Sequence, residues 1–415
     1  MRACIHRGSH QIGGSCVEVE SGGERLLIDL GLPLDVDDNT IAYLPPIAGL
    51  DGNDPGLKGI LISHPHIDHY GLLAHISPEL PVGMGAAARH ILAAAAPWMP
   101  SGFNLTNSGW DFRSGEMLEI GSFRVTPYLM DHSAYDAYAL LIEADEKRLF
   151  YSGDFRGHGR KATLYNDIIS NPPADVDALL LEGTTLGRSD NSSPALTEKE
   201  IETRLVEVFK ATPGLAMVHT SAQNIDRIVS IFRASKRSGR RLLIDLYTAA
   251  VLEATRNPNV PQSHWPEVAL FVPHKQRIKI KENGWFELLK RHSINRIFIE
   301  QLRDNLNKFT LLFRPVYRDD LEKGGCLEGA CYIYSLWEGY WNRGSFDRVA
   351  DWLSRNSIHK QSLHTSGHAD PEDLHRLVEA IKPEKVTPIH TFRPDLYPGL
   401  FPNVEFHEDG EWWEI

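Results

Sequence analysis

Short apolar runs, several with polar residues at alternate positions, recur along residues 1–185. Residues 58–63 are mostly apolar, as expected of a buried strand, and residues 15–20 and 25–29 flank a Gly-Gly turn as two paired strands do. The same patterns predict further strands at residues 121–125, 137–143, 147–152 and 175–181, and helices at residues 71–76 and 86–96. This mixture predicts a sandwich of sheets covered by helices.

After residue 185 the pattern changes. Residues 186–195 are polar and rich in Ser and Asn, which is typical of a linker. Thr197 and Glu200 have the spacing of a capping box, so a helix is expected to begin there and to end near residue 211. Beyond it, strands are predicted at residues 215–220, 241–246, 309–317 and 330–335, and helices at residues 222–238, 248–255 and 344–355. This alternation predicts a mostly parallel sheet, in a second domain inserted into the first.

The last segment, from residue 360, returns to the first domain. It contains a predicted helix at residues 371–381, a strand at residues 386–389 and a terminal hairpin that turns at Asp409-Gly410. We therefore expect an α/β chain of three parts: residues 1–185 form the first part of a sandwich domain, residues 186–359 an inserted α/β domain, and residues 360–415 the second part of the sandwich domain.

The charge of the chain is unevenly distributed. The net charge is −12, which by itself argues against a nucleic-acid partner. Residues 183–360, however, hold 27 Lys and Arg against 20 Asp and Glu, a net charge of +7, while the remainder carries −19. Two basic stretches, residues 236–241 and 275–281, lie in the insertion. A solvated face is the usual meaning of such stretches, but here they also suit attraction of a polyanion.

The four cysteines form no Cys-x-x-Cys pair and suggest reduced thiols in a cytosolic protein. The N-terminus lacks the apolar segment of a secretory signal, and no apolar run is long enough to span a bilayer. We therefore expect a cytoplasmic protein without a membrane partner.

The densest group of chemically active side chains directly follows the strand at residues 58–63. It consists of His64, His66, Asp68 and His69. Imidazole and carboxylate groups are the ligands that zinc prefers, and His64 and His66 share a face because alternate strand positions do. A polar loop whose histidines only form hydrogen bonds is the alternative, although His-x-His-x-Asp-His at a strand end rarely arises by chance.

This stretch resembles the signature of the metallo-β-lactamase fold family, which implies an αββα sandwich and three further ligands. His132, Asp154 and His390 match them, and each lies just beyond an apolar or β-branched run. A lone histidine after a strand is more often structural than a ligand, but the other six residues of the pattern favour His390 as the seventh ligand. The resemblance also implies that Asp29 supports the ligand loop by hydrogen bonds, where the residues alone allow an ordinary turn aspartate.

The family pattern divides these residues between two ions, which are expected to be zinc, with manganese as the alternative. One ion would take His64, His66 and His132, the other Asp68, His69 and His390, and Asp154 would bridge them. Two such ions can activate water and clamp a phosphoryl oxygen, which needs no Ser or Cys nucleophile. We leave His158, close to Asp154, as a structural residue.

The inserted domain is similar to that of the β-CASP nucleases within this family, in which such an insertion caps the metal cleft. Two further motifs of that subgroup are matched by Glu182, at the end of an apolar run, and by His368 in a Ser-Gly-His-Ala context. The match is best with the ribonuclease J type. The resemblance implies catalytic roles for Asp68, Glu182 and His368, and a substrate-binding segment formed by His364, Thr365, Ser366, Gly367 and His368.

The residues themselves agree with this assignment. A hydroxyl, backbone N–H groups and an imidazole before a helix suit a phosphate, and Gly367 allows close approach of the backbone. His368 could protonate the leaving 3′ oxygen, with Glu182 holding its imidazole charged. The alternative for His364 and His368 is a second metal pair at helical spacing. The aromatic cluster Tyr334, Trp337, Tyr340 and Trp341 could stack bases, although burial in a core is the commoner role.

The resulting hypothesis is two-metal hydrolysis of single-stranded RNA, by 5′-to-3′ exonuclease action with endonuclease cleavage also open. The alternatives are a β-CASP nuclease that acts mainly on DNA, a hydrolase of small esters or lactones, and an inactive RNA-binding or scaffolding subunit. The ribonuclease J type usually carries a further C-terminal domain that supports oligomerisation, whereas this chain ends at Ile415. The oligomeric state is therefore left open, with a homodimer as one option. Thr391-Phe392 also differs from the Gly-Glu that relatives often have after this histidine.

Overall fold

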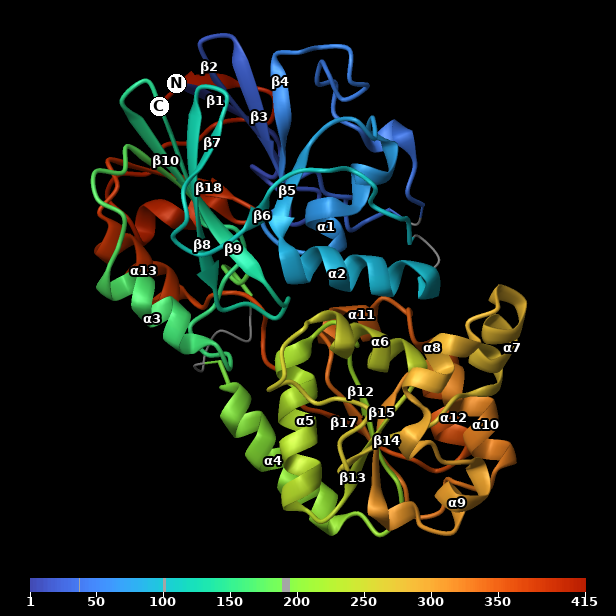
Figure 1. The fold of residues 1–415 in the computed structure, drawn as a ribbon. Helices are drawn as coiled ribbons and strands as arrows, with labels where there is room; N and C mark the ends of the chain where they lie inside the picture. Colours follow the sequence, from blue (N-terminus) through green and yellow to red (C-terminus); the bar gives the residue numbers. More distant parts are fainter. Residues whose placement is uncertain (37, 100–101, 189–194) are drawn as a thin grey trace. The chain divides into compact units, whose positions relative to one another are not determined.

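The computed structural model describes residues 1–36, 38–99, 102–188 and 195–415 (Figure 1). The chain divides into two compact units. Unit 1 comprises residues 1–195 and 367–415, and unit 2 comprises residues 196–366. Most of the Ser/Asn-rich linker predicted at residues 186–195 lies outside the described residues. Among the described residues, no helix combines the length and the apolar character needed to cross a membrane.

Unit 1 contains two sheets. The first has the order β19-β1-β2-β3-β4-β5-β6. Its strands are β1 (Arg2–Arg7), β2 (Cys16–Ser21), β3 (Glu24–Ile28), β4 (Leu57–Leu61), β5 (Val82–Gly85), β6 (Asp111–Phe112) and β19 (Trp412–Glu414). The second has the order β18-β11-β10-β9-β8-β7. Its strands are β7 (Leu118–Ile120), β8 (Phe123–Met130), β9 (Ala137–Ala144), β10 (Lys147–Tyr151), β11 (Ala178–Glu182) and β18 (Lys385–Ile389).

Helices cover the outer faces of this pair of sheets. They are η1 (Ile41–Tyr43), α1 (Ile67–Tyr70), η2 (Gly71–His75), α2 (Ala86–Ala95), η3 (Ala96–Trp98), α3 (Ala162–Ser170), α13 (Pro371–Ile381) and η7 (Pro394–Gly399). One buried cluster joins side chains of both sheets, such as Val19 and Leu140, and separate clusters lie under α2 and under α3 with α13. The predicted αββα sandwich is therefore confirmed.

Unit 2 is built on one parallel sheet of order β14-β13-β15-β12-β16-β17. Its strands are β12 (Ala216–His219), β13 (Arg241–Ile244), β14 (Val268–Leu270), β15 (Phe309–Phe313), β16 (Cys331–Tyr334) and β17 (Lys360–Ser362). Its longer helices are α4 (Glu198–Ala211), α5 (Ile225–Arg237), α6 (Leu246–Ala254), α7 (His274–Asn283) and α12 (Asp347–Arg355). Shorter ones are α8 (Phe286–Arg291), η4 (Ser293–Asn295), α9 (Ile299–Arg303), η5 (Leu306–Lys308), η6 (Pro315–Tyr317), α10 (Arg318–Lys323) and α11 (Glu338–Asn342).

Several local predictions hold in detail, and one is wrong. Thr197 and Glu200 form the predicted capping box of α4. The terminal hairpin is not formed: Val404 makes an isolated parallel bridge with Val386, and Trp412–Glu414 pairs with β1. The strands at the end of the chain thus have partners distant in sequence, which a local turn signal cannot indicate. The chain also returns to unit 1 later than expected, because β17 pairs with β16 in unit 2.

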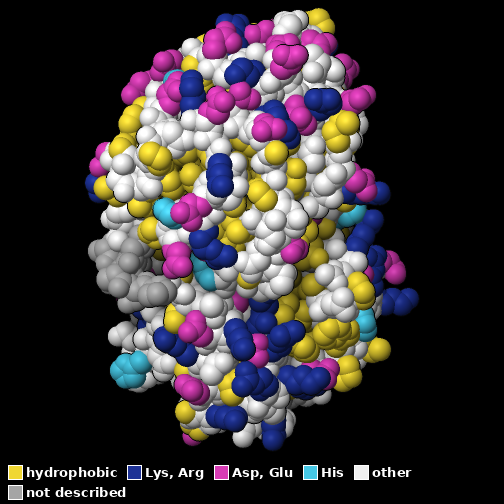
Figure 2. Space-filling model, turned by 90° about the vertical axis from the view of Figure 1, so that its left-hand side faces the viewer, with side chains coloured by type: hydrophobic (Ala, Val, Ile, Leu, Met, Phe, Trp, Pro, Cys, Tyr) yellow, Lys and Arg dark blue, Asp and Glu magenta, His cyan; other side chains and the backbone are white. Residues whose placement is uncertain are grey.

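The first of the two basic stretches of unit 2 is largely structural. In residues 236–241, Arg240 is buried and donates hydrogen bonds to the carbonyl oxygens of Phe209, Gly214 and Phe309. Its neighbours Lys236 and Arg237 form ion pairs with glutamates. Much of this stretch therefore holds unit 2 together. Figure 2 shows Lys and Arg side chains gathered on the surface of this unit, in the lower part of the view.

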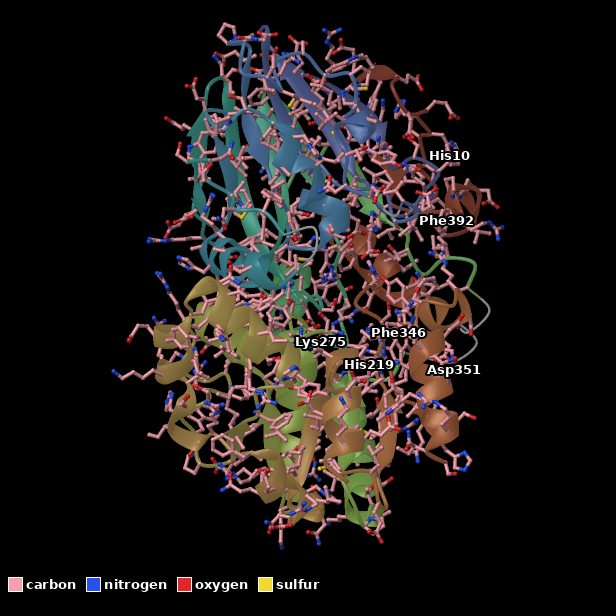
Figure 3. All side chains as sticks on the ribbon, turned by 90° about the vertical axis from the view of Figure 1, so that its right-hand side faces the viewer. His10, His219, Lys275, Phe346, Asp351 and Phe392 are labelled. Carbon is pink, nitrogen blue, oxygen red and sulfur yellow. The ribbon has the colours of Figure 1, made fainter. Side chains whose placement is uncertain are left out.

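The predicted aromatic cluster is mainly part of the core of unit 2. Tyr334 is fully buried, and Trp341 packs against the core with its ring centroid 5.0 Å from that of Tyr334. His219 contacts Phe346 edge-on beside them, at 4.8 Å between centroids (Figure 3). Tyr340 is the exposed member, with 41% of its surface accessible. Burial, the commoner role, thus describes Tyr334 and most of Trp341.

A buried ion pair in unit 2 leads to a prediction about stability. Arg227 and Glu198 are both fully buried, and Nη2 of Arg227 lies 2.9 Å from Oε1 of Glu198. Arg227→Met should lower the free energy of unfolding by about 3–5 kcal/mol, because the glutamate loses the cation that compensates its buried charge. Arg237→Met, which removes the half-exposed pair with Glu202, should cost less than about 1 kcal/mol. Urea unfolding of both variants measures this difference, and equal costs would contradict it.

Candidate metal centre

Four of the seven predicted ligands lie on the loop and short helix that follow β4. They are His64, His66, Asp68 and His69. The backbone N–H of Ser15 donates a hydrogen bond to the carbonyl oxygen of Asp68 at 3.1 Å, which ties this loop to the first sheet. Glycine is required at position 31, where the backbone passes the ligand loop, because a Cβ atom there would lie 1.7 Å from the carbonyl oxygen of Asp68. The ligand loop is therefore fixed by backbone contacts on the sheet.

The remaining ligands are delivered by the second sheet. His132, Asp154 and His390 follow β8, β10 and β18, and Glu182 is the last residue of β11. β10, β11 and β18 pair in parallel, and β9 runs antiparallel to both β8 and β10. The carboxyl ends of all four strands therefore meet at one edge of the sheet, which explains why residues so distant in sequence converge.

Three histidines form the first group. Nδ1 of His66 lies 3.2 Å from Nε2 of His64 and 3.2 Å from Nε2 of His132. Burial lowers the pKa of His66 to about 4, and it also lowers the pKa values of His64 and His132 well below their ordinary range. Three neutral imidazole nitrogens thus face one point, as a zinc-type ion requires.

Asp68, His69 and His390 form a second group, and Asp154 lies between the two groups. Oδ2 of Asp68 lies 3.9 Å from Nε2 of His69 and 3.8 Å from Nε2 of His390. Oδ2 of Asp154 lies 3.2 Å from Nε2 of His69 and 3.6 Å from Nε2 of both His390 and His64. The carboxylate of Asp154 is thus within reach of both groups, as a bridging ligand would be.

The donor atoms of this cluster fit bound cations. Among the described residues, Nε2 of His69, Nε2 of His390 and both carboxylate oxygens of Asp154 are buried without a hydrogen-bond partner. Burial would lower the pKa of His69, but the carboxylates of Asp154, Asp29 and Asp68 outweigh it and raise that pKa well above its usual value. A site that attracts a proton so strongly also attracts a metal ion.

Two further residues orient the ligand imidazoles from behind. Oδ2 of Asp29 accepts hydrogen bonds from Tyr151 and from Ser63, and it lies 2.7 Å from Nδ1 of His69. The predicted support of the ligand loop by Asp29 is confirmed. Nδ1 of His390 lies 2.7 Å from Oγ of Ser15. The role of Ser15 was not predicted, because nothing in the local sequence connects it to a histidine near the other end of the chain.

Removal of Asp29 should weaken metal binding. In an Asp29→Ala variant, Nδ1 of His69 loses the carboxylate that fixes the ring with Nε2 toward the cluster. We expect the affinity for zinc to fall by about 10- to 100-fold, since such supporting residues typically have effects of this size. Competition with a chromogenic chelator measures the affinity. Asp145→Ala, at an exposed carboxylate that pairs with the N-terminus, is the control and should leave the affinity unchanged.

His368 and Glu182 form a pair beside this cluster. Nδ1 of His368 lies 3.1 Å from Oε2 of Glu182 and 3.5 Å from Oδ2 of Asp154. Glu182 also accepts a hydrogen bond from the backbone N–H of Phe155 at 2.9 Å. Burial would lower the pKa of His368, but the carboxylates of Glu182 and Asp154 raise it above its usual value. Gly367 allows this segment to pack closely against Ser133, because a Cβ atom at position 367 would lie 2.4 Å from Oγ of Ser133.

The expected substrate-binding segment crosses the boundary between the units. His364, Thr365 and Ser366 belong to unit 2, whereas Gly367 and His368 belong to unit 1. In unit 2, Nη2 of Arg227 lies 3.5 Å from the carbonyl oxygen of Thr365. His364 and His368 are not paired on a helix, because α13 begins only at Pro371 and both residues lie in the non-helical segment before it.

One more group of metal-capable side chains lies in unit 1. His158, Asp370 and Asp373 bring ligand atoms within 4.8 Å of one another. The two aspartates have clear structural roles: Asp370 caps α13, and Asp373 accepts a hydrogen bond from the backbone N–H of Gly157. The two aspartates of this group are therefore explained without a metal.

The sequence matches two known family profiles. Residues 11–203 match the metallo-beta-lactamase superfamily, and residues 358–396 match the Zn-dependent metallo-hydrolase RNA specificity domain. The superfamily match implies divalent metal ions, in agreement with the donor atoms described above. The segment from His364 to His368 and the ligand candidate His390 both lie within the second match.

Several curated relatives are named ribonuclease J. The protein of Sinorhizobium meliloti is 23% identical over 362 residues, which cover 84% of this chain and 60% of that protein. The protein of Helicobacter pylori strain ATCC 700392 is 20% identical over 402 residues, which cover 92% of this chain and 55% of that protein. The chain thus spans little more than half the length of these relatives.

A solved structure has the same fold. It is described as a crystal structure of a protein of unknown function from Enterococcus faecalis V583, and it superposes with a TM-score of 0.80 at 21% identity over 99% of both chains. The αββα sandwich and the cluster of buried histidines and aspartates thus accompany a metallo-beta-lactamase superfamily match over residues 11–203 and an RNA specificity domain match over residues 358–396.

Proposed function

We propose that this chain is a two-zinc hydrolase of phosphodiester bonds in single-stranded RNA, of the β-CASP ribonuclease J type. The observation that carries the proposal is the convergence of seven ligand side chains beside the His368–Glu182 pair. The RNA specificity domain and the relatives named ribonuclease J support RNA as the substrate. We assign unit 2 as the β-CASP domain, with bounds at residues 196 and 366.

The proposed ligands follow the two groups of donor atoms. His64, His66 and His132 would hold one ion, Asp68, His69 and His390 the other, and Asp154 would bridge them. Two zinc ions would activate water at neutral pH and neutralise the charge of the phosphoryl group. The same imidazole and carboxylate donors also allow manganese. The four cysteines are free thiols, which suits the reducing cytoplasm as the place of action.

The chain's own residues would position the substrate and move its proton. Glu182 faces Nδ1 of His368, and the imidazole would donate a proton to the leaving 3′ oxygen. The carboxylates that raise the pKa of His368 keep this imidazole charged before the step. Asp29 and Ser15 hold His69 and His390 in the orientation that the cluster needs. Ser366 and Gly367 would bind a phosphate of the strand ahead of α13.

The proposed activity can be tested with a single RNA sequence in three forms: 5′-monophosphate RNA, 5′-triphosphate RNA and 5′-monophosphate DNA. We expect the first to be degraded from its 5′ end to mononucleotides and faster than the other two, since a 5′ monophosphate would bind at Ser366–His368. A ladder of internal fragments would instead indicate endonuclease cleavage. Faster digestion of the DNA would favour the DNA nuclease, and intact RNA in the presence of zinc or manganese would overturn the proposal.

A further inference from the structure

Unit 2 contains a cavity whose lining residues are all its own. Its volume is about 420 Å³, within the range of small-molecule sites. The lining includes Phe271, which directly follows β14, and Val316, Asp319, Asp320 and Lys323, which follow β15. The sheet order β14-β13-β15 places these two segments beyond the carboxyl ends of parallel strands. In open α/β sheets this edge is where ligands bind.

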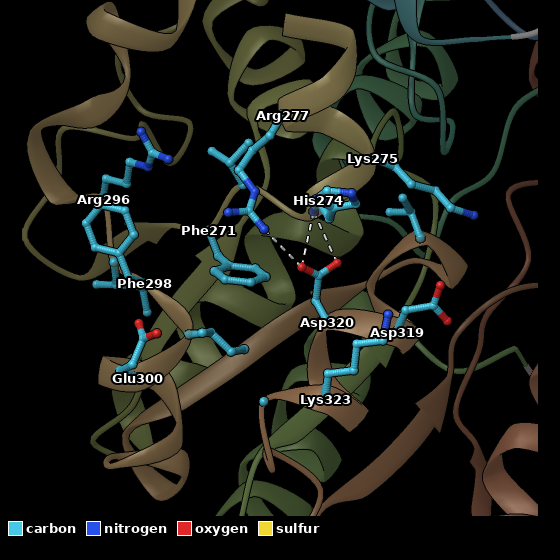
Figure 4. Close-up of a pocket in the computed structure, with 15 residues that line it drawn as sticks. Phe271, His274, Lys275, Arg277, Arg296, Phe298, Glu300, Asp319, Asp320 and Lys323 are labelled. Carbon is cyan, nitrogen blue, oxygen red and sulfur yellow. Dashed lines mark hydrogen bonds and ion pairs between the residues drawn. The ribbon is translucent and has the colours of Figure 1, made fainter. Parts of the chain in front are cut away.

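Three of the cations around the cavity have no anionic partner among the residues that the structure describes. Lys275, Arg296 and Lys323 line it, and none of the three forms an ion pair or a side-chain hydrogen bond with any described residue. Burial and the nearby guanidinium of Arg277 lower the pKa of Arg296, in keeping with a positive charge that no carboxylate neutralises. Arg277 itself lies 3.5 Å from Asp320, a carboxylate that also accepts hydrogen bonds from the backbone N–H of His274 (Figure 4).

An exposed aromatic ring lies next to these cations. Phe298 leaves 54% of its surface accessible, which is unusual for so large an apolar side chain, and the guanidinium of Arg296 lies 5.0 Å from the centre of its ring (Figure 4). An aromatic ring beside a guanidinium is a surface on which nucleobases stack. Glu300 and Asp319, which also line the cavity, are exposed carboxylates suited to accept hydrogen bonds from ribose hydroxyls.

We propose that this cavity is a binding site for a ribonucleotide, with its base on Phe298 beside Arg296 and its phosphate near Lys275 and Lys323. None of its lining residues belongs to unit 1 or to the seven candidate ligands. The same chemistry is offered by a free mononucleotide and by one nucleotide of a longer single strand. A simple inorganic anion would use the cations alone and leave the exposed ring without a role.

Equilibrium dialysis of the full chain against labelled adenosine 5′-monophosphate (AMP) tests the site. The measurement is made in a chelator, so that no metal in unit 1 can hold or turn over the probe. Phe298→Ala and Arg296→Ala should each weaken binding by at least about fivefold, because each removes one side of the stacking contact. Ile294→Ala is the matched control. It removes an apolar side chain that is 75% exposed in the same segment but does not line the cavity, and binding should stay unchanged.

A short oligoadenylate and inorganic phosphate complete the experiment. If both variants weaken AMP binding, the ligand is a free nucleotide, and if they weaken only the oligoadenylate, it is part of a strand; both results support the site. Unchanged binding of both probes in Phe298→Ala and Arg296→Ala would overturn it. Inorganic phosphate that competes as well as AMP would also overturn it, because the base would then contribute nothing. A failure of the nuclease proposal would leave these results unaffected, since they require no turnover.

Discussion

Asp154→Ala should reduce the hydrolysis of 5′-monophosphate RNA by more than about a thousandfold, the largest effect that we expect from one substitution. Its carboxylate lies within 3.6 Å of His64, His69 and His390, so its loss removes the carboxylate that is proposed to bridge both groups of donors. Single-turnover assays at saturating zinc measure the rate. At saturating zinc, a slower rate reflects the missing bridging carboxylate rather than a lower affinity for the metal.

Asp395→Ala provides the matched control for this variant. Asp395 is an exposed aspartate of unit 1 that pairs with Arg393 on the surface. Its removal should leave the rate within about twofold of the unmodified chain, since surface ion pairs contribute little. RNA hydrolysis that survives in Asp154→Ala would show that the seven-residue cluster is not the catalytic centre.

His368→Gln should slow RNA hydrolysis by about 10²- to 10⁴-fold, the usual contribution of a general acid. The imidazole is proposed to protonate the 3′ oxygen as it leaves, and glutamine cannot supply that proton. A nitrophenyl phosphodiester has a leaving group that departs without protonation. We therefore expect the same variant to hydrolyse this substrate almost as fast as the unmodified chain does.

The comparison of the two substrates distinguishes a proton donor from a structural residue. If His368 acted only by holding the fold or by binding a metal, both substrates would slow by the same factor. Glu182→Gln should follow the pattern of His368→Gln with a smaller effect, because it removes the charge that faces Nδ1 but leaves the imidazole in place. Equal losses on RNA and on the nitrophenyl ester would contradict the assignment.

The candidate site could be foreseen from the sequence because its residues follow strand ends. A ligand such as His132 or Asp154 comes just after an apolar run, and the run itself is visible as a pattern. The partners that orient the ligands could not be foreseen equally well. Ser15 contacts His390 across most of the chain, and that contact depends on the pairing of distant strands. The prediction of a terminal hairpin was wrong for the same reason: Trp412–Glu414 pairs with β1, a strand distant in the sequence.

In unit 2, the local sequence pattern predicted some elements and missed others. Its strand–helix alternation predicted the parallel sheet, but the region between α6 and β15 gave no signal, and β14 and α7 were missed. α7 carries charges around most of its surface and buries only Gln276 and Ile280, so it lacks the apolar stripe by which a helix is recognised. By composition, the basic stretch at residues 236–241 looks the same as the basic stretch in α7. Arg240 of the first stretch is nevertheless buried and structural.

The most direct test of the account is the metal content of the full chain, purified without chelators and equilibrated with zinc. Inductively coupled plasma mass spectrometry should find two ions per chain, and fewer in Asp154→Ala at the same free zinc concentration, while Asp395→Ala should keep both. A chain that binds no zinc, or an Asp154→Ala variant that binds as much as the unmodified chain, would contradict the proposed two-metal centre and with it the nuclease mechanism.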